Sequence, residues 1–425
     1  MAERIMRFAL VSLIASAIGI ASLPAFAQQP SKITLEDAIK LALDNSPTIR
    51  AQRTNIDQSK AQEITANLRP NPVLGWDTQF IPLFSPNLFS TDTLNNLQQF
   101  DIGVGYLFER GKKRQRRLEA AKDQTAVTDA QVHDAERALS FNVAQQFVNV
   151  LLAESNLQFT ATDLDSYVRT VQINEDRYKA GDLSKVDFLK IKVQLLQFQT
   201  DVNVARLQRV QALTTLRQLI GYDQLPKDYD VIGELEYKPV HAGLDDLEAL
   251  ALRERPDYRA TQLGINSAQS QLNLAKANGK QDLDVTFDFS HVSAASSGSF
   301  FFNIPLPVFN RNQGEIARTR FALTQSQFTS TAARDTVFTD VRNAFEGLNA
   351  NQEIVTLYQS GYLQQAQESR DISEFAYKQG AAALLDYLDA ERSYRATQLA
   401  YRQALAAYMV SLEQLKQATG TRNLP

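Results

Sequence analysis

Cysteine is absent from this sequence of 425 residues, and histidine occurs only three times. Without cysteine, an exported chain has no disulfides to stabilise it and no acylated N-terminal cysteine to anchor it. Beyond residue 27 no stretch approaches about 18 consecutive apolar residues, so we expect no helix that spans a membrane. A membrane role would then require strands closed into a barrel, which also satisfies backbone hydrogen bonds in lipid.

The three histidines, His133, His241 and His291, lie far apart in the sequence. No HExxH helix, Cys–His pair or GxSxG elbow occurs, and Gly103-x-Gly105 lacks the third glycine of a dinucleotide-binding loop. The sequence therefore predicts no enzyme, no cofactor and no metal site; an exported hydrolase built from scattered carboxylates is the formal alternative. A net charge of −4 and the lack of interleaved aromatic residues argue against a nucleic-acid binder.

The first residues have the layout of a cleaved secretory signal. Arg4 and Arg7 precede an apolar run, Phe8–Leu23, and the small-residue triplet Ala25-Phe26-Ala27 follows it. The run is shorter than the roughly 20 residues that cross a bilayer as a helix. We therefore expect residues 1–27 to be a signal peptide, with a retained anchor as the alternative.

The rest of the chain is a near-duplication at a spacing of about 200 residues. Leu35, Pro47 and Arg50 match Leu244, Pro256 and Arg259, and Tyr178-Lys179-x-Gly181 matches Tyr377-Lys378-x-Gly380. The matches keep their order, with small changes of offset. We expect a first repeat over residues 28–232 and a second over residues 233–425.

Each half shows the same series of patterns. Apolar and polar residues alternate over residues 73–108 and again over 283–309, which predicts one strand hairpin in each half. In the second hairpin, residues 293–299 are the expected turn and Phe300–Phe309 the second strand. Two stretches without proline, 111–180 and 313–379, carry apolar residues three and four apart, which predicts uninterrupted helices of about 100 Å. Each turns back at a glycine, so helical hairpins are expected over 111–221 and 313–420.

Four strands in one chain cannot close a barrel around a lumen, because lipid would leave both edges without hydrogen-bond partners. Three chains with four strands each would supply 12, within the even-numbered range of outer-membrane barrels. Polar residues at alternate positions would face a wet interior, while Trp76, Tyr106 and the run Phe300–Phe302 would face lipid or its interfaces. A soluble sheet packed on a helix is the alternative that this pattern leaves open.

Several segments, taken in order, resemble the TolC-type outer-membrane efflux proteins over nearly the whole mature chain. They are ITLEDAIKLALDNSP, YKAG and LRQLIG in the first half, and RPDYRA, PLPVFNRNQGEIA, YKQGAAALLDYLDAERS and QLKQATG in the second. The resemblance implies a mainly α protein with a small β part, in which long helical hairpins form an α-barrel. Four strands per chain would contribute to a 12-stranded transmembrane β-barrel in a homotrimer. It places residues 222–243 in a mixed belt around the middle of the tunnel.

The function implied by the resemblance is a passive exit duct in the cell outer membrane that extends into the periplasm. Such a channel serves a tripartite efflux or type I secretion system, with a periplasmic adaptor protein and an inner-membrane pump as partners, and needs no cofactor. A non-channel periplasmic coiled-coil adaptor or structural protein is the alternative; adaptors lack the second copy and the amphipathic strand pairs. The pump selects the cargo, so drugs, metal cations and polypeptides all stay open.

In such a family the helix-to-helix turns after Gly181 and Gly380 form the periplasmic mouth. By the resemblance, Asp386 and Asp389 match acidic constriction rings that narrow the closed pore; two solvated helix charges are the alternative. A latch between these carboxylates and a lysine of a neighbouring hairpin is a hypothesis, because alanines replace the basic residue that TolC has at this turn. The expected gate contacts are Tyr377, Tyr178, Asp182, Lys185, Asp187 and Lys190.

A basic cluster lies where the second predicted strand passes into the first long helix. Its members are Arg110, Lys112, Lys113, Arg114, Arg116 and Arg117. A solvated helix start is one interpretation, although positive charge there is slightly unfavourable for the helix dipole. At the inner face of a membrane, each charge would gain about 1 kcal/mol beside an anionic surface. We therefore expect this cluster to contact outer-membrane lipid.

Overall fold

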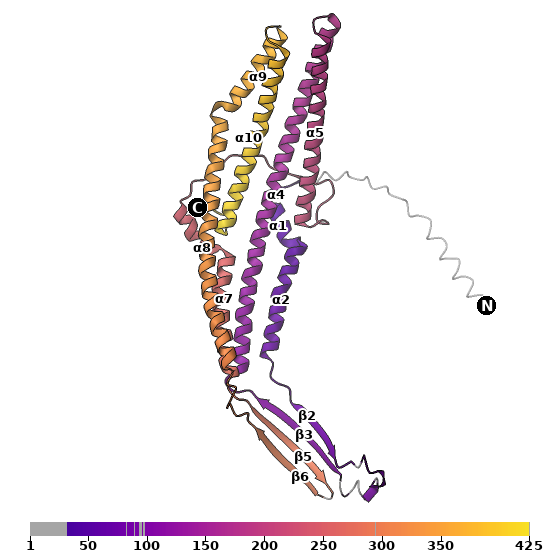
Figure 1. Cartoon of the computed structure of the whole chain (residues 1–425), viewed down its shortest axis with the longest axis vertical. Coiled ribbons are helices and arrows are strands. Elements are labelled where there is room, and N and C mark those ends of the chain that lie inside the picture. Colours follow the sequence, from indigo (N-terminus) through magenta and orange to yellow (C-terminus); the bar gives the residue numbers. More distant parts are fainter. Residues whose placement is uncertain are drawn as a thin grey trace, which may run out of the picture.

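The computed structural model describes residues 32–81, 83–88, 90–92, 96, 98–293 and 295–424, so the expected signal peptide, residues 1–27, lies outside the described residues. The molecule is a long rod with the strands at one end and the turns between the long helices at the other (Figure 1). The first half comprises β1 (Lys32–Ile33), α1 (Leu35–Asn45), α2 (Pro47–Asn67), β2 (Val73–Gln79), the 3₁₀ helix η1 (Pro86–Leu88), β3 (Gln99–Phe108), α4 (Lys113–Ala180), α5 (Lys185–Ile220) and β4 (Asp230–Val231). The second comprises α6 (Leu244–Glu254), α7 (Pro256–Asn278), β5 (Leu283–Val292), β6 (Ala295–Asn303), α8 (Gln313–Leu357), the π-helical turn η2 (Tyr358–Tyr362), α9 (Leu363–Lys378) and α10 (Leu384–Thr419).

The first helical hairpin consists of α4 and α5. α4 runs unbroken for 68 residues, a length of about 100 Å. It ends at Gly181, whose φ of 88° suits glycine because glycine has no Cβ. Ser184 then caps α5, where its Oγ accepts a hydrogen bond from the backbone N–H of Asp187 at 3.1 Å. The chain therefore reverses sharply at this tip.

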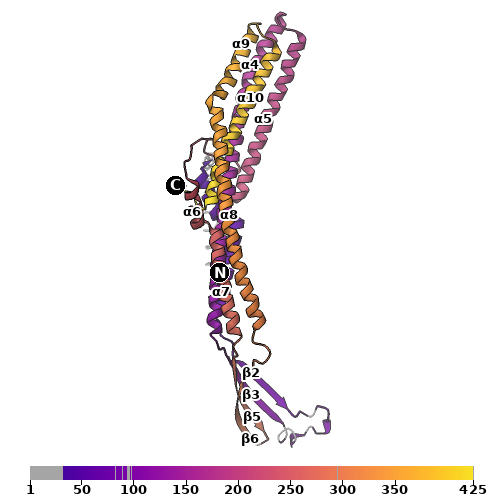
Figure 2. The ribbon, with the colours of Figure 1, turned by 60° about the vertical axis from the view of Figure 1, so that its left-hand side comes forward.

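The second long helix is broken, so the prediction of an uninterrupted helix over residues 313–379 is wrong. α8 passes into η2, in which Gly361 has φ 124° and ψ −16°. Residues with a side chain rarely adopt this backbone conformation, so glycine permits the break. α9 consequently leans away from the line of α8 (Figures 1 and 2).

The four longer strands form one antiparallel sheet in the order β2-β3-β5-β6. β3 and β5, from different halves of the chain, pair at its centre. The expected turn over residues 293–299 is wrong, because residues 295–299 already pair with β5. β6 ends at Asn303 rather than at residue 309, since Pro305 and Pro307 lack the N–H that a strand ladder needs.

Three apolar clusters lie along the helices. The first, around Phe147 and Leu216, joins α1, α4 and α5. The second, around Tyr408, joins α6, α8 and α10. The third, near the helical tips, joins the two hairpins through residues such as Tyr167 and Tyr387. Beside the first cluster, β1 pairs in parallel with β4. The long helices are thus held by seams at several levels.

None of the helices in the described ranges has a segment long and apolar enough to cross a membrane.

Arg255 fixes the end of α10 to the start of α7. Its side chain is 3% exposed and its guanidinium pairs with Asp257 at 2.6 Å and with Asp340 at 2.9 Å. It also donates to the backbone carbonyl of Ala418 at 3.3 Å. Gly420, with φ 78°, ends α10 against the backbone of Arg255, where an added Cβ would approach to 3.0 Å. Two segments that the sequence marks separately, RPDYRA and QLKQATG, therefore meet here.

We expect Gly420→Ala to lower the free energy of unfolding by about 2 kcal/mol or more. The left-handed backbone costs a residue with a Cβ roughly 1–2 kcal/mol, and here the Cβ also meets Arg255. Gly264→Ala is the matched control, because this glycine lies within α7 with open space around its Cα. It should raise the unfolding free energy by about 0.5–1 kcal/mol. Urea unfolding in detergent, followed by circular dichroism, measures both; equal effects would contradict this account of Gly420.

Candidate functional site

One face of the sheet is apolar and exposed. The register places Trp76 opposite Ile102, and Ile102 opposite Phe289, so these side chains share a face. Trp76 is 73% exposed, and its ring centroid lies 6.0 Å from that of Phe100. Such a contiguous apolar face marks a surface that meets another apolar medium. The same face carries Leu74, Val104, Tyr106, Phe287, Phe300 and Phe302.

The expected placement of the whole run Phe300–Phe302 on one face is wrong for Phe301. Phe301 pairs with Thr286, whereas Phe300 pairs with Phe287. Successive side chains of a strand point to opposite faces, so Phe301 lies among polar residues. The run supplies two aromatic side chains to the apolar face, not three.

The opposite face of the sheet is polar. Asp77 lies opposite Asp101, which in turn lies opposite Ser290. Gln99 donates from Nε2 to Asp101 Oδ2 at 2.8 Å and to Ser290 Oγ at 3.3 Å. Hydrogen-bonded carboxylates and amides of this kind suit a surface that meets water, because burying them in lipid would cost several kcal/mol each. The sheet therefore separates an apolar side from a polar side.

β2 and β6 are the edge strands of this sheet. Among the described residues, no further strand pairs with the outer side of either one. Each edge presents unpaired N–H and C=O groups, which an apolar medium cannot satisfy. The sheet is therefore incomplete in a single chain.

Asp386 and Asp389 lie in the first turns of α10, at the helical tip. Asp386 Oδ2 accepts a hydrogen bond from the backbone N–H of Ala383 at 3.3 Å, which caps the helix. Asp389 Oδ1 lies 3.4 Å from Nη1 of Arg392. Both aspartate side chains are exposed. Both carboxylates can therefore meet charges of another molecule.

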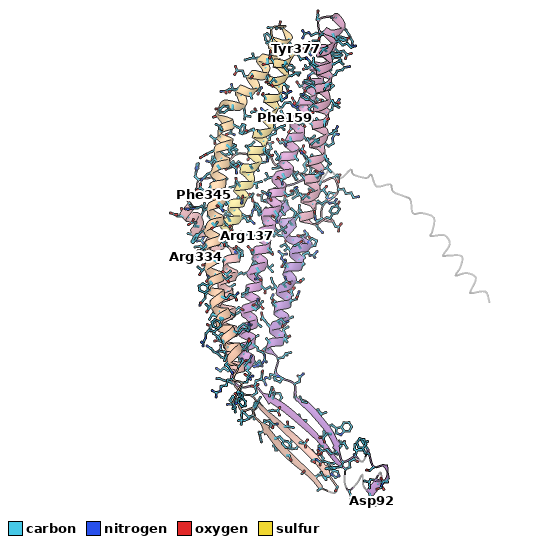
Figure 3. All side chains as sticks on the ribbon, in the orientation of Figure 1. Asp92, Arg137, Phe159, Arg334, Phe345 and Tyr377 are labelled. Atoms are coloured by element: carbon cyan, nitrogen blue, oxygen red, sulfur yellow. The ribbon has the colours of Figure 1, made fainter. Side chains whose placement is uncertain are left out.

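Tyr377 lies near the helical tip, at the opposite end of the molecule from Asp92 (Figure 3). Its hydroxyl donates to Asn174 Oδ1 at 2.7 Å, which joins α9 to α4. Its ring stacks on Tyr387 with 5.6 Å between centroids, and burial raises the pKa of Tyr377. Sequence reasoning missed Asn174, although a polar residue that follows Val171 in an apolar seam is a usable signal.

Three of the other expected gate residues contact their own hairpin. Tyr178 stacks on Phe188 with 5.0 Å between ring centroids. Lys190 Nζ lies 3.2 Å from Asp187 Oδ1. The hydrogen bonds from Ser184 and then from Lys190 hold the pKa of Asp187 below its usual value. These contacts organise the turn between α4 and α5.

Asp182 and Lys185 are exposed at the same turn. Within one chain, the ion pairs of the described residues include none between Lys185 or Lys190 and the acidic pair of α10. A latch of that kind would need a neighbouring copy.

Two members of the basic cluster are held by the protein itself. Lys113 is buried, and its Nζ donates to Asp282 Oδ2 at 2.7 Å. Arg117 pairs with Glu109 and donates to the carbonyl of Leu68 at 3.2 Å. The hydrogen bond with Glu109 raises the pKa of Arg117. These two cations fasten the start of α4 to the neighbouring segments.

The remaining members face outward. Arg116 pairs with Glu119 at 2.6 Å on the helix surface. Arg110 and Lys112 are exposed and Arg114 is half-buried, and no ion pair of the described residues includes any of these three. Three positive charges are thus left for the surroundings at the junction of sheet and helices.

Buried charges within the helical seam form a further group that sequence reasoning missed. Glu391 and Arg395 are buried and follow Tyr387 on α10 at spacings of four residues. Charged residues at positions where a seam expects apolar ones are the signal that could have found them. No group of three or more His, Asp or Glu side chains able to hold a metal ion occurs in the described ranges.

The chain is similar to several known proteins over most of its length. It is 22% identical to the cobalt-zinc-cadmium resistance protein CzcC of Cupriavidus metallidurans, over 90% of this chain and 89% of CzcC. It is 23% identical to the pyoverdine export outer membrane protein OpmQ of Pseudomonas aeruginosa, over 91% of this chain and 85% of OpmQ.

The fold and the family agree with these similarities. The structure superposes on the Campylobacter jejuni CmeC outer membrane channel with a TM-score of 0.76 at 16% identity, covering 94% of this chain and 90% of CmeC. The family model described as outer membrane efflux protein matches residues 38–222 and 247–421, one segment in each half. With most of its described residues matched, this chain belongs to the outer membrane efflux protein family.

Proposed function

We propose that this protein is the outer-membrane channel of a tripartite efflux or type I secretion system, acting as a passive exit duct built from three copies. The observation that carries the proposal is the sheet, which has an exposed apolar face, a polar face and two unpaired edges. Closure with other copies pairs the edges, turns the apolar face to lipid and lines the interior with polar residues. Three copies of four strands give a barrel of 12.

A second surface supports assembly from several copies. α5 carries exposed apolar residues at spacings of three and four: Val186, Leu189, Val193 and Leu196. Such a stripe is typical of a coiled-coil seam whose partner helix is missing. In a ring of copies, the stripe would pack on a helix of the next chain, and the hairpins would form an α-barrel.

In this assembly the acidic pair of α10 would line the mouth of the duct. Three-fold symmetry brings together three copies of Asp386 and Asp389, both exposed at the helical tip. A ring of carboxylates attracts cations and repels anions. Tyr377 and its partner Asn174 would hold the two hairpins of each chain together beside this ring.

The partners proposed are a periplasmic adaptor protein and an inner-membrane pump. CzcC is named for resistance to cobalt, zinc and cadmium, and OpmQ for export of pyoverdine, so relatives of similar identity differ in cargo. We therefore assign cargo selection to the pump. The alternative of a periplasmic adaptor leaves the exposed aromatic face of the sheet without a role.

Asp386→Ala/Asp389→Ala is expected to enlarge single-channel conductance and weaken cation selectivity, because it removes the ring of negative charge. The measurement is conductance of the purified mature protein in a planar bilayer, with its oligomer mass determined in parallel. Asp176→Ala/Glu368→Ala, which removes one exposed carboxylate near the end of α4 and one in the first half of α9, is the control. A water-soluble monomer without conductance would contradict the channel.

The outward-facing cations should govern contact with anionic lipid. Arg110→Gln/Lys112→Gln/Arg114→Gln is expected to weaken binding to anionic liposomes about tenfold or more, since each charge contributes about 1 kcal/mol. The control Arg206→Gln/Arg320→Gln/Arg342→Gln removes three exposed charges from the helices and should bind as wild type. Flotation with liposomes of stated anionic content measures both variants; equal losses would refute the interfacial role.

A further inference from the structure

A buried charged cluster joins the two helical hairpins between their tips and the break at Gly361. Asp163 comes from α4, Asp201 from α5, and Glu391 and Arg395 from α10. Asp163 and Glu391 are each 7% exposed and Arg395 is 9% exposed. Charges buried this deeply lose most of their hydration, so the loss of a charged partner here would weaken the contact between the hairpins.

Arg395 bridges both helices of the first hairpin from its place on α10. Its Nε forms an ion pair with Asp163 Oδ2 at 2.6 Å, and its Nη2 donates to Asp201 Oδ2 at 2.7 Å. The guanidinium also lies 3.9 Å from the ring centroid of Phe198 on α5. One side chain of the second hairpin therefore holds two helices of the first.

Glu391 adds a second buried carboxyl beside Asp163, and the negative charge of Asp163 opposes the loss of the proton from Glu391. With a proton on Glu391, Asp163 and Asp201 are the negative charges that face Arg395. Without it, two negative charges lie side by side within the seam.

The titratable and charged groups that face Glu391 come from every helix packed around it. α9 contributes Arg370, which pairs with Asp371 at 2.6 Å and lies 4.2 Å from the ring centroid of Tyr394. The groups that interact with Glu391 are Asp163 and Tyr167 on α4, Arg370 on α9, and Tyr387, Tyr394 and Arg395 on α10. Asp201 on α5 and Glu374 on α9 interact in turn with Arg395 and Tyr387. Burial first, and then the charge of Asp163, raise the pKa of Glu391 to about 7.

The break at Gly361 gives the second hairpin a place to bend. Backbone at φ 124° interrupts the α-helical ladder there, and α9 leans from α8 just above it (Figure 1). α4 and α10 are both continuous helices without such a break. The charged cluster lies on the tip side of this break, so it restrains the segment that can pivot.

We propose that Asp163, Glu391 and Arg395 form a proton-dependent clamp that holds α10, and with it α9, against the first hairpin, with Gly361 as the point at which α9 bends when the clamp opens. The effect on the mouth rests on the proposed channel function, because α10 carries Asp386 and Asp389. The swing itself is a property of one chain. In this arrangement Glu391 is a positioning residue that acts on the mouth through α10.

The direction of the pH effect follows from the raised pKa of Glu391. A carboxyl that keeps its proton in the clamped state, and loses it more readily when released to water, favours the clamp at low pH. The clamp is strongest below the ordinary pKa of a glutamate and weakens as the pH rises through about 7. Alkaline conditions should therefore release the hairpin.

Distances between spin labels on the two hairpins test the clamp directly. The chain has no cysteine, so Gln172→Cys on α4 and Gln379→Cys at the end of α9, both exposed, give unique labelling sites. Labelled chains are diluted in excess unlabelled chains, so that each assembly carries one labelled copy. Double electron–electron resonance in detergent from pH 5 to pH 8 then reports the ratio of short to long distances.

We expect one short distance at pH 5 and a growing long-distance population toward pH 8, with the ratio falling at most about tenfold per pH unit. Glu391→Gln keeps the shape and an N–H donor without a charge, and should hold the short distance at pH 8. Glu368→Gln, an exposed carboxyl on α9, should behave as wild type. Gly361→Ala should reduce the displacement while leaving Glu391 intact.

An unchanged distance in the wild type between pH 5 and pH 8 would overturn the clamp. So would a Glu391→Gln variant that follows the wild-type pH response. Because this measurement needs no ion flow, its outcome is separable from the bilayer experiment. A protein without conductance but with the expected distance change would keep the clamp and refute only the channel.

Discussion

Backbone hydrogen bonding at the two edges of the sheet constrains the whole molecule. The outer edges of β2 and β6 carry unpaired N–H and C=O groups, while one face of the sheet between them carries exposed aromatic rings. An apolar environment cannot form hydrogen bonds with those groups, so strands of other copies of the chain must pair with them. β3 ends at Phe108 and α4 begins at Lys113, so only a short turn joins the sheet to the first long helix. The position of the start of α4 is therefore tied to the position of the sheet.

Periodicity in the sequence predicts those elements whose burial is set by one face. The alternation around Trp76 and Ile102 and the three-and-four spacing along α4 both reflect such burial, and both elements are observed. The strand over residues 295–299 could not be predicted in this way. Its small residues are typical of turns, and they form a strand because they pair with β5. The helix break at Gly361 could not be predicted either, since an isolated glycine is tolerated in many helices and its φ depends on the surrounding packing.

The positions of some charges at the candidate site could be predicted from the sequence, and those of others could not. Exposure of Asp386 and Asp389 follows from their place in the first turns of a helix. The pairing of Lys113 with Asp282 does not, because the two are 169 residues apart in sequence and meet only in the folded chain. The buried hydrogen bond between Tyr377 and Asn174 joins one position of α9 to one position of α4, so it favours a particular register of these two helices.

The break at Gly361 occurs in one half of a duplicated chain, and this gives the two halves different mechanical properties. α4 is one continuous helix, while the corresponding helix of the second half is broken between α8 and α9. In a ring of three chains, continuous and broken long helices would alternate around the circumference. Such a tube would contain six long helices of similar position, of which only the three broken ones could bend toward the axis. Its opening would therefore narrow to a triangle rather than to a circle.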